Sequence, residues 1–307
     1  MSAIQTVIDS IGLGALYALM AVGIALVFGV MRLVNFAYGQ LIMFGAYALA
    51  FTNSLPEGVS ILVCLAVVVA LSLAMGIAFV PLRRASPATM LVATFAISFL
   101  LQNIALLSYS YRNKPIGDPA LVLSGLNRAF TVGSVHVRWI TLVLIGTGAV
   151  CLAALALLLE RTDIGLQIRA AAADFHTARL LGVQAGRVIA FAFLVSGVLA
   201  AIVAVLFVVQ APFVTPDYGL KETIIVLVAV VVGGIDRLTT ATLGGFTIGL
   251  ATGLFGGFLH GQGPEQGSFP FTTRVYLDSV IFLLVILVLL LRPGGLFARG
   301  GAPQERV

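Results

Sequence analysis

The sequence from Glu160 to Arg187, ERTDIGLQIRAAAADFHTARLLGVQAGR, is a long polar stretch between two strongly apolar parts of the chain. Within it, apolar side chains recur at helical spacing at Ile168, Ala171, Ala172 and Phe175. This spacing predicts a helix with one narrow apolar face. Because the flanking segments are typical of membrane spans, the stretch fixes where one group of spans ends and the next begins.

A second, shorter helix is predicted within the same stretch. Asp174 is a suitable N-cap for a helix over Phe175–Leu181, and Gly182 is placed to end it. Such a helix would be only roughly 10 Å long, too short to be stable without a partner surface. Two interpretations remain open, namely a cytoplasmic loop bound by a soluble partner and an amphipathic connector lying on lipid headgroups.

The composition indicates a membrane protein. Hydrophobic residues make up 60% of the 307 residues and charged residues 9%, and the mean hydropathy is +1.13. These values exclude an ordinary soluble domain. The net charge of +5 arises mainly from loop arginines, so we take it as a signal of membrane orientation and not of nucleic-acid binding. Cys64 and Cys151 stand alone in apolar runs and are expected to be inert packing residues.

The predicted fold is an all-α, polytopic transmembrane bundle of about nine spans, with eight or ten possible. Residues 1–307 are expected to form a single transmembrane domain. The expected segments are Ser10–Val30, Phe36–Thr52, Ser60–Leu82, Ala88–Tyr109, Trp139–Leu159, Val188–Gln210, Lys221–Ile235, Leu243–Leu259 and Val275–Leu291. The seventh and eighth are short for a hydrocarbon core of about 30 Å, so tilted, partial or re-entrant helices are expected there.

The distribution of cations predicts the orientation. If residues 160–187 are cytoplasmic and all nine segments cross, the C-terminus is inside and the N-terminus outside. The inside set is Arg32, Arg83, Arg84, Arg161, Arg169, Arg179, Arg187, Arg237, Arg292, Arg299 and Arg306. The smaller outside set is Arg112, Lys114, Arg128, Arg138, Lys221 and Arg274. Because cytoplasmic loops carry the excess of Lys and Arg, this orientation is favoured over its inverse.

Residues 110–138 are the predicted extracytoplasmic loop. Phe130–Val132 and Val135–Val137 flank Gly133-Ser134, a pair suited to a type II′ hairpin turn. A docking surface and a structured linker are both compatible with this pattern.

Two further features lie among the apolar segments. In GVMRLVNFAYGQLIMFGAY (29–47), the residues Asn35, Tyr38, Gly39 and Gln40 bring polar groups and flexible backbone to a helix junction. Transporters build substrate sites from such breaks, although a tight turn at the membrane face would look the same.

The second feature is a stripe of glycines in GGFTIGLATGLFGG. Gly245, Gly249, Gly253 and Gly257 recur every four residues and therefore line one helix face. Small residues at this spacing let a neighbouring backbone approach closely, either within the chain or in another subunit.

The sequence also lacks several kinds of site. No predicted segment centre carries a charged residue or histidine, because Lys221, Glu222 and Asp278 fall at segment ends. This disfavours proton-coupled carriers. There is no G-x-x-x-x-G-K-[ST] loop, so nucleotide hydrolysis within this chain is not expected. We predict no catalytic residues, no metal ligands and no cofactor.

Four motifs together resemble the inner-membrane permeases of branched-chain amino acid ABC importers. Asn35-Phe36-Ala37-Tyr38-Gly39 is similar to their motif after the first span, with Tyr38 where His is usual. The run VVVGGIDRLTTATLGGFTIG resembles their late glycine motif, although Asp236 replaces a glycine, and RPGGLF matches their closing motif. In the central loop the matching residues are Arg169-Ala170, Asp174, Ala178, Leu181-Gly182-Val183 and Arg187-Val188. The resemblance covers residues 8–299.

The resemblance implies a multi-pass inner-membrane protein in which related groups, residues 10–109 and 188–291, flank the fifth segment. It also implies a second homologous permease, two cytoplasmic ABC ATPases and an extracytoplasmic substrate-binding protein, besides membrane lipid. Residues 160–187 would be the ATPase-coupling loop, with Arg169, Asp174, Ala178, Arg179, Leu181 and Gly182 as coupling residues. Substrates would be branched-chain or related amino acids, with urea or short amides as the alternative. An ATP-independent facilitator and an assembly subunit also remain open.

Overall fold

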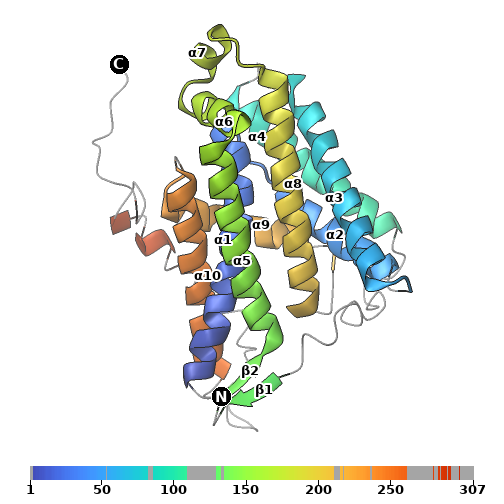
Figure 1. Ribbon diagram of the computed structural model, residues 1–307, viewed down its shortest axis with the longest axis vertical. Helices are drawn as coiled ribbons and strands as arrows, with labels where there is room; N and C mark the ends of the chain where they lie inside the picture. The colour runs from blue at the N-terminus through green and yellow to red at the C-terminus, as the bar shows by residue number, and fades with distance from the viewer. Residues whose placement is uncertain are drawn as a thin grey trace.

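The computed structural model describes residues 3–52, 54–81, 86–108, 129–132, 135–210, 215–216, 218–235, 237–260, 279, 283, 285–288, 290–291 and 297. These residues form a helical bundle with one short β-hairpin (Figure 1). The elements are α1 (Ala3–Met31), α2 (Tyr38–Phe51), α3 (Glu57–Phe79), α4 (Pro87–Ser108), β1 (Ala129–Val132), β2 (Val135–Arg138), α5 (Trp139–Arg161), α6 (Asp163–Ala173), α7 (Phe175–Leu180), α8 (Ala185–Gln210), α9 (Tyr218–Gly233) and α10 (Leu238–His260).

Six of the described helices, α1, α3, α4, α5, α8 and α10, are long and apolar enough to cross a membrane. The count of nine spans is therefore not confirmed. The second predicted segment forms α2, which has only 14 residues, and the seventh forms α9, with 16 residues. The ninth, Val275–Leu291, lies mostly outside the described residues.

The expectation of a short eighth segment was wrong. Residues 243–259 belong to α10, which has 23 residues. The polar residues before Leu243 had marked the segment's start, but Thr240 and Thr242 are accommodated in the helix. Their hydroxyls donate to the carbonyls of Arg237 (2.9 Å) and Leu238 (2.7 Å). A helix can thus begin several residues before its apolar run.

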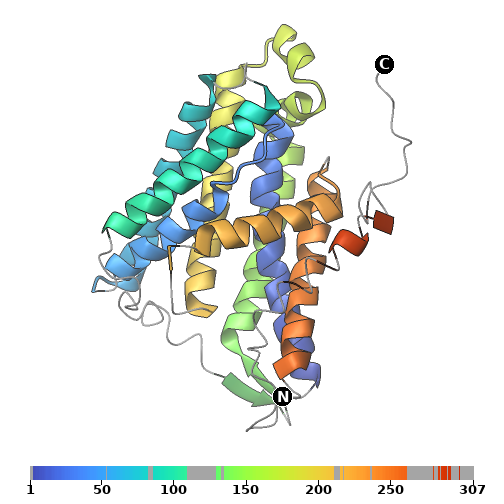
Figure 2. The same ribbon diagram turned by 180° about the vertical axis from the view of Figure 1, so that it is seen from behind.

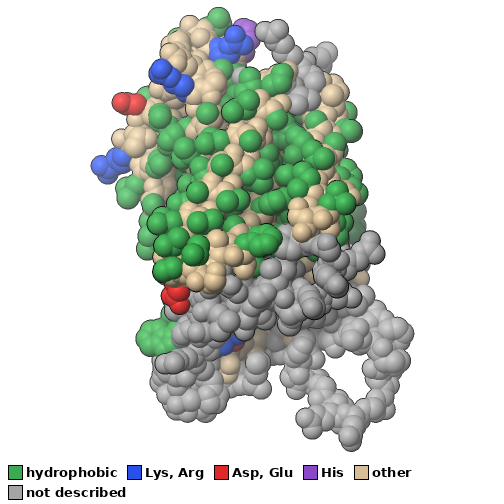
Figure 3. All heavy atoms as spheres, turned by 90° about the vertical axis from the view of Figure 1, so that its right-hand side faces the viewer, with side chains coloured by type: hydrophobic (Ala, Val, Ile, Leu, Met, Phe, Trp, Pro, Cys, Tyr) green, Lys and Arg blue, Asp and Glu red, His purple; other side chains and the backbone are tan. Residues whose placement is uncertain are grey.

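Helix α1 is the centre of the bundle. In its most apolar window 83% of residues are buried, against 22–28% in α3, α4, α5 and α10. Helices α5, α8, α9 and α10 all contact it. The outer helices turn broad apolar surfaces outward, and Figure 3 shows one such face, on which most of the visible Lys and Arg side chains lie at the upper end.

The glycine stripe lies between α10 and α1. A Cβ atom on Gly245 would lie 2.6 Å from Ala21 Cβ, and one on Gly253 would lie 2.6 Å from Ser10 Cα. At Gly249 the added atom would lie 2.8 Å from both Gly14 Cα and Leu13 O. The neighbour of this stripe is therefore α1 of the same chain. Gly257 continues the spacing within α10, but its contacts are outside those described.

The two ends of the bundle differ. The loop formed by α6 and α7 projects at one end, and the β-hairpin lies at the other (Figure 1). The predicted hairpin is confirmed, with Phe130 paired to Val137 and Val132 to Val135. Its turn, Gly133-Ser134, and residues 110–128 lie outside the described residues.

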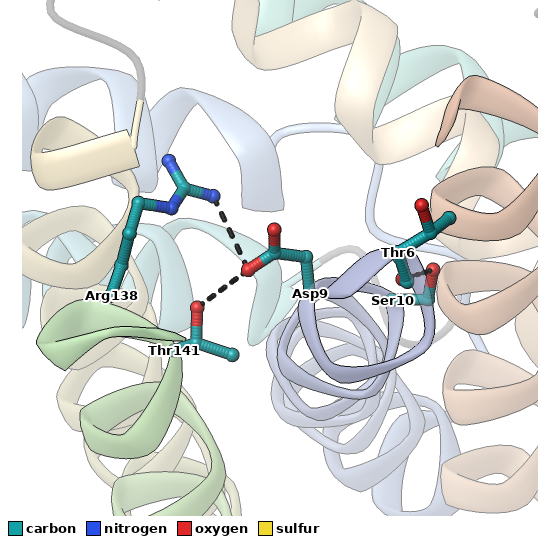
Figure 4. Close-up of polar contacts among 5 residues, drawn as sticks. All are labelled: Thr6, Asp9, Ser10, Arg138 and Thr141. Carbon is teal, nitrogen blue, oxygen red and sulfur yellow. Dashed lines mark hydrogen bonds and ion pairs between the residues drawn. The ribbon is translucent and has the colours of Figure 1, made fainter. Parts of the chain in front are cut away.

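Polar contacts fasten the hairpin end to α1. Arg138 forms an ion pair with Asp9 at 3.5 Å, and Thr141 Oγ1 donates to Asp9 Oδ1 at 2.8 Å. Figure 4 shows both groups converging on the Asp9 carboxylate, while Ser10 Oγ donates to the Thr6 carbonyl on another side of α1. Charged partners at this position are consistent with an end of the bundle outside the hydrocarbon core.

The α1–α10 contact gives a direct stability test. Gly249→Ala should destabilise the fold by about 1–3 kcal/mol, because the added methyl meets backbone atoms that cannot rotate away. The matched control is Gly146→Ala in α5, where nothing lies within 4 Å of the added atom. Thermal unfolding midpoints in detergent should fall for Gly249→Ala and stay level or rise for Gly146→Ala. Equal midpoints would show that this seam is not tightly packed.

Candidate functional site

The junction between α1 and α2 is a structured break in the helix. Residues 32–35 are not helical, and Arg32 has a positive φ of 54°, which is uncommon for a residue other than glycine. Its guanidinium donates to the Ala172 carbonyl of α6 at 2.8 Å. Asn35 Oδ1 accepts from the Ala37 N–H at 3.0 Å. Side chains at the break thus satisfy the backbone N–H of Ala37 and a carbonyl near the end of α6.

After this break, the start of α2 meets the start of α9. The Gly39 N–H donates to Thr223 Oγ1 at 2.8 Å, and that hydroxyl donates to the Gly219 carbonyl at 2.7 Å. A Cβ atom on Gly39 would overlap the Gly219 carbonyl oxygen. Glycine is therefore required at position 39 for the two backbones to approach this closely.

Four buried polar atoms around these two helix starts have no hydrogen-bond partner within the described part of the chain. They are Asn35 Nδ2, Tyr38 Oη, Gln40 Oε1 and Tyr218 Oη. Leaving a buried polar group unpaired costs roughly 1–3 kcal/mol. The concentration of such groups at one place indicates a polar site and argues against a simple tight turn.

All four residues expected on the substrate pathway lie here and are buried. The Tyr38 ring fills the space beside Gly23 of α1, where a Cβ would overlap its hydroxyl. Gln40 Nε2 donates to Ser98 Oγ of α4 at 3.3 Å. Tyr38, Gly39 and Gln40 therefore connect the start of α2 to α1, α9 and α4, respectively.

The same arrangement occurs twice along the chain. A long helix, α1 or α8, precedes a short helix, α2 or α9, that begins with Tyr-Gly: Tyr38-Gly39 in one case and Tyr218-Gly219 in the other. Helix α1 ends beside α6, whereas α8 begins there, so the two long helices run in opposite directions (Figure 1). This is the relationship expected of inverted repeats.

The sequence analysis missed a carboxylate in this region. Tyr17 Oη of α1 donates to Glu222 Oε2 of α9 at 2.9 Å. Tyr17 is eight residues after Asp9 and fifteen before Arg32, hence about 12 Å from the first and about 22 Å from the second along α1. Because α1 is long and apolar enough to cross a membrane, this contact places Glu222 beside the middle of that candidate span.

This placement bears on two inferences drawn from the sequence. Lys221 and Glu222 do stand near the end of a helix, but that helix crosses the bundle at mid-height, between its two ends (Figure 2). Lys221 therefore lies on a helix and not in a loop. Glu222 stands near the end of its own segment, as the sequence indicates, yet it contacts the middle of the candidate span formed by α1. The sequence signal that could have pointed to Glu222 was the repeated Tyr-Gly pair, because Glu222 stands four residues after Tyr218.

The loop between α5 and α8 forms the two short helices that the sequence predicts. Thr162 Oγ1 caps α6 by accepting from the Gly165 N–H at 3.0 Å. Asp174 Oδ1 caps α7, accepting from His176 N–H at 2.9 Å and Thr177 N–H at 3.2 Å. The pKa of Asp174 is held below its usual value by two hydrogen bonds from Thr177. The larger effect comes from the Thr177 hydroxyl, which donates to Asp174 Oδ2, and the smaller from the Thr177 backbone N–H.

The end of α7 is also fixed by its own backbone. Gly182 has φ +91°, the Val183 N–H donates to Ala178 O, and the Gly182 N–H donates to Arg179 O, both at 3.1 Å. This pair of bonds is a Schellman motif. A six-residue helix is thus closed at both ends within the chain.

The coupling residues expected in this loop divide into two groups. Arg169, Asp174, Arg179, Leu181 and Gly182 are exposed. Ala178, in contrast, is buried, so its position suits packing of α7 and not contact with another protein. Leu180, which was not among the expected residues, is 76% exposed beside Leu181 at 80%.

Sequence comparisons with known proteins point to one family. The family model for the permease component of branched-chain amino acid transport systems matches residues 6–290. The high-affinity branched-chain amino acid transport system permease proteins BraD of Pseudomonas aeruginosa and LivH of Escherichia coli are 30% and 28% identical to the chain. Each alignment covers 96% of both proteins.

Among solved structures, a chain of a metal-chelate type ABC transporter in an inward-facing conformation aligns with a TM-score of 0.47 and 19% identity. The alignment covers 94% of this chain and 85% of that one. The match of the family model to nearly the whole sequence decides the relationship. The chain belongs to the family of branched-chain amino acid transport system permease components.

Proposed function

We propose that the chain is the permease subunit of an ATP-binding-cassette importer that moves branched-chain or related amino acids across the inner membrane by alternating access. Support comes from the family and from the transport systems named for its relatives. The observation that carries the ATP-driven part is the doubly capped α7, which presents two exposed leucines at the end of the bundle.

Helix α7 has the features needed to seat in a groove of a cytoplasmic ATPase. Leu180 and Leu181 supply an apolar contact, and Arg169 and Arg179 supply exposed cations nearby. Because its caps are internal, α7 is already ordered before it binds, which lowers the entropic cost of association. A loop that only lay on headgroups would not need both ends of a six-residue helix to be fixed.

A continuous set of contacts leads from this loop to the polar break. Arg32 joins the last turn of α6 to the end of α1 through the Ala172 carbonyl. Residues 33–37 then connect to α2, and Gly39 is bonded to Thr223 of α9. In the proposed cycle, closure of two ATPases displaces α7 and α6, and this set of contacts shifts α2 and α9 relative to α1.

The remaining partners follow from the same proposal. A second homologous permease would complete the pathway, and an extracytoplasmic binding protein would deliver substrate at the hairpin end, which is the outer end in this assignment. Exposed cations of the α6–α7 loop favour a cytoplasmic position for that end.

The proposed orientation is testable with single cysteines after Cys64→Ala and Cys151→Ala. Gln184→Cys, at the α6–α7 end, should react with a membrane-impermeant maleimide only after permeabilisation. Ser54→Cys, in the exposed turn between α2 and α3, should react in intact cells. Labelling of Gln184→Cys in intact cells would invert the assignment.

The coupling role is tested by Gly182→Val and Asp174→Ala. A β-branched residue at φ +91° is strained by roughly 1–2 kcal/mol, and loss of Asp174 removes the N-cap. Both variants should insert normally while ATPase co-purification or ATP-driven uptake falls several-fold. The folded pKa of Asp174 is lowered, so its cap is intact at neutral pH and is lost only as pH falls through that pKa.

Gly186→Val is the matched control, because Gly186 is also exposed but no positive φ restricts it. Uptake and ATPase activity should be measured in proteoliposomes holding the complete complex. Uptake that continues in Gly182→Val without any ATPase would contradict ATP-driven import and favour an ATP-independent facilitator.

A further inference from the structure

Glu222 of α9 is a carboxylate inside the membrane-spanning part of the bundle that the coupling mechanism above does not use. It accepts a hydrogen bond from Tyr17 Oη at 2.9 Å. An acid at this depth is costly and is retained in membrane proteins mainly for function. The carboxylate therefore calls for a ligand-related explanation.

A second, independent observation lies one helical turn away. Tyr218 precedes Glu222 by four residues on α9, so both side chains lie on one face of the helix. The Tyr218 ring packs on Phe207 with centroids 4.1 Å apart, and its hydroxyl is buried without a hydrogen-bond partner. The hydroxyl oxygen of Tyr218, which can accept a hydrogen bond, and the carboxylate of Glu222 therefore lie on the same face of α9, next to α1.

The surrounding charge is also unusual for a surface within the membrane. Lys221 is exposed and Glu222 half-buried on the single chain, and α9 crosses the middle of the face seen in Figure 2. A lysine cannot be left against lipid tails at this depth. This cost favours protein or a water-filled path on this side of α9, and opposite charges on adjacent residues suit a ligand that carries both signs.

We propose that Glu222, with the hydroxyls of Tyr17 and Tyr218, binds the ammonium group of a zwitterionic amino acid as it passes along α9. This inference rests on the proposed function, of which it specifies the substrate-binding group. A carboxylate and two phenol oxygens supply acceptors for the three N–H bonds of a primary ammonium. Helix α9 would then be a wall of the pathway, and its shift relative to α1 would open and close the site.

The test is Glu222→Gln in the complete reconstituted complex. Glutamine keeps the size of the side chain and can still accept the Tyr17 hydrogen bond, so a purely structural role predicts little change. The ammonium site predicts at least about a tenfold loss of ATP-driven leucine uptake, with assembly and basal ATPase activity retained. Glu222→Asp should recover part of the uptake. Glu57→Gln, a carboxylate at the exposed start of α3, is the matched control and should transport normally.

A binding readout separates this inference from the proposed function. The thermal unfolding midpoint of the complex should rise with leucine but not with 4-methyl-2-oxopentanoate, which lacks the ammonium group, and the rise should vanish in Glu222→Gln. If wild-type uptake proves independent of ATP while this leucine shift persists, the proposed function fails and the site stands.

Several outcomes would overturn the site itself. They are wild-type uptake in Glu222→Gln, failure of that variant to assemble, and a leucine shift that is absent from the wild type or unchanged in the variant. An equal shift with ammonium chloride would show a general small-cation site and would likewise overturn the assignment to an amino acid.

Discussion

The close backbone contact between Gly39 and Gly219 is the constraint on which the rest of the site depends. Each glycine begins a short helix, and the Thr223 hydroxyl bonds to both backbones. A side chain at Gly39 would meet the opposite carbonyl, so the two helix starts could not remain together inside the bundle. Their meeting brings Asn35, Gln40 and Tyr218 to one buried region and places Glu222 against α1. In hydrocarbon such non-helical backbone is tolerable only where protein or a polar cavity surrounds it.

The packing around α1 makes this arrangement possible. Glycines of α10 allow α1 and α10 to approach closely along much of their length, and α1 remains buried while the outer helices face outward. A buried central helix can carry Tyr17 inward and still end in Arg32, whose guanidinium reaches α6. One helix therefore contacts both the polar region and the α6–α7 loop. Helix α1 is therefore a candidate for coupling the two regions. Such coupling requires that events at the polar region and at the α6–α7 loop shift the same equilibrium between two conformations.

Much of the fold could be predicted from the sequence because its local signals are strong. Asp174 and Gly182 mark the ends of α7, Gly133-Ser134 marks the hairpin, and apolar runs mark the long helices α1, α3, α4, α5 and α8. The glycine spacing in α10 indicated a close contact, but only the three-dimensional structure shows that its neighbour is α1. The position of Glu222 could not be found in this way. Hydropathy shows that it stands near the start of an apolar segment, yet the depth at which that segment begins is set by contacts with distant residues, Gly39 and Tyr17.

The depth of Lys221 tests most directly whether α9 begins inside the membrane. A nitroxide attached to Lys221→Cys, in a background without Cys64 and Cys151, can be compared by electron paramagnetic resonance with labels at Ser54→Cys and Leu107→Cys in lipid bilayers of the assembled complex. The depth obtained from oxygen and nickel-chelate accessibility should lie well below the headgroups, with more access to the water-soluble chelate than a lipid-facing label has. A depth at the headgroup level would contradict the account, because α9 would then start at the surface and Glu222 would not lie on a path through the membrane.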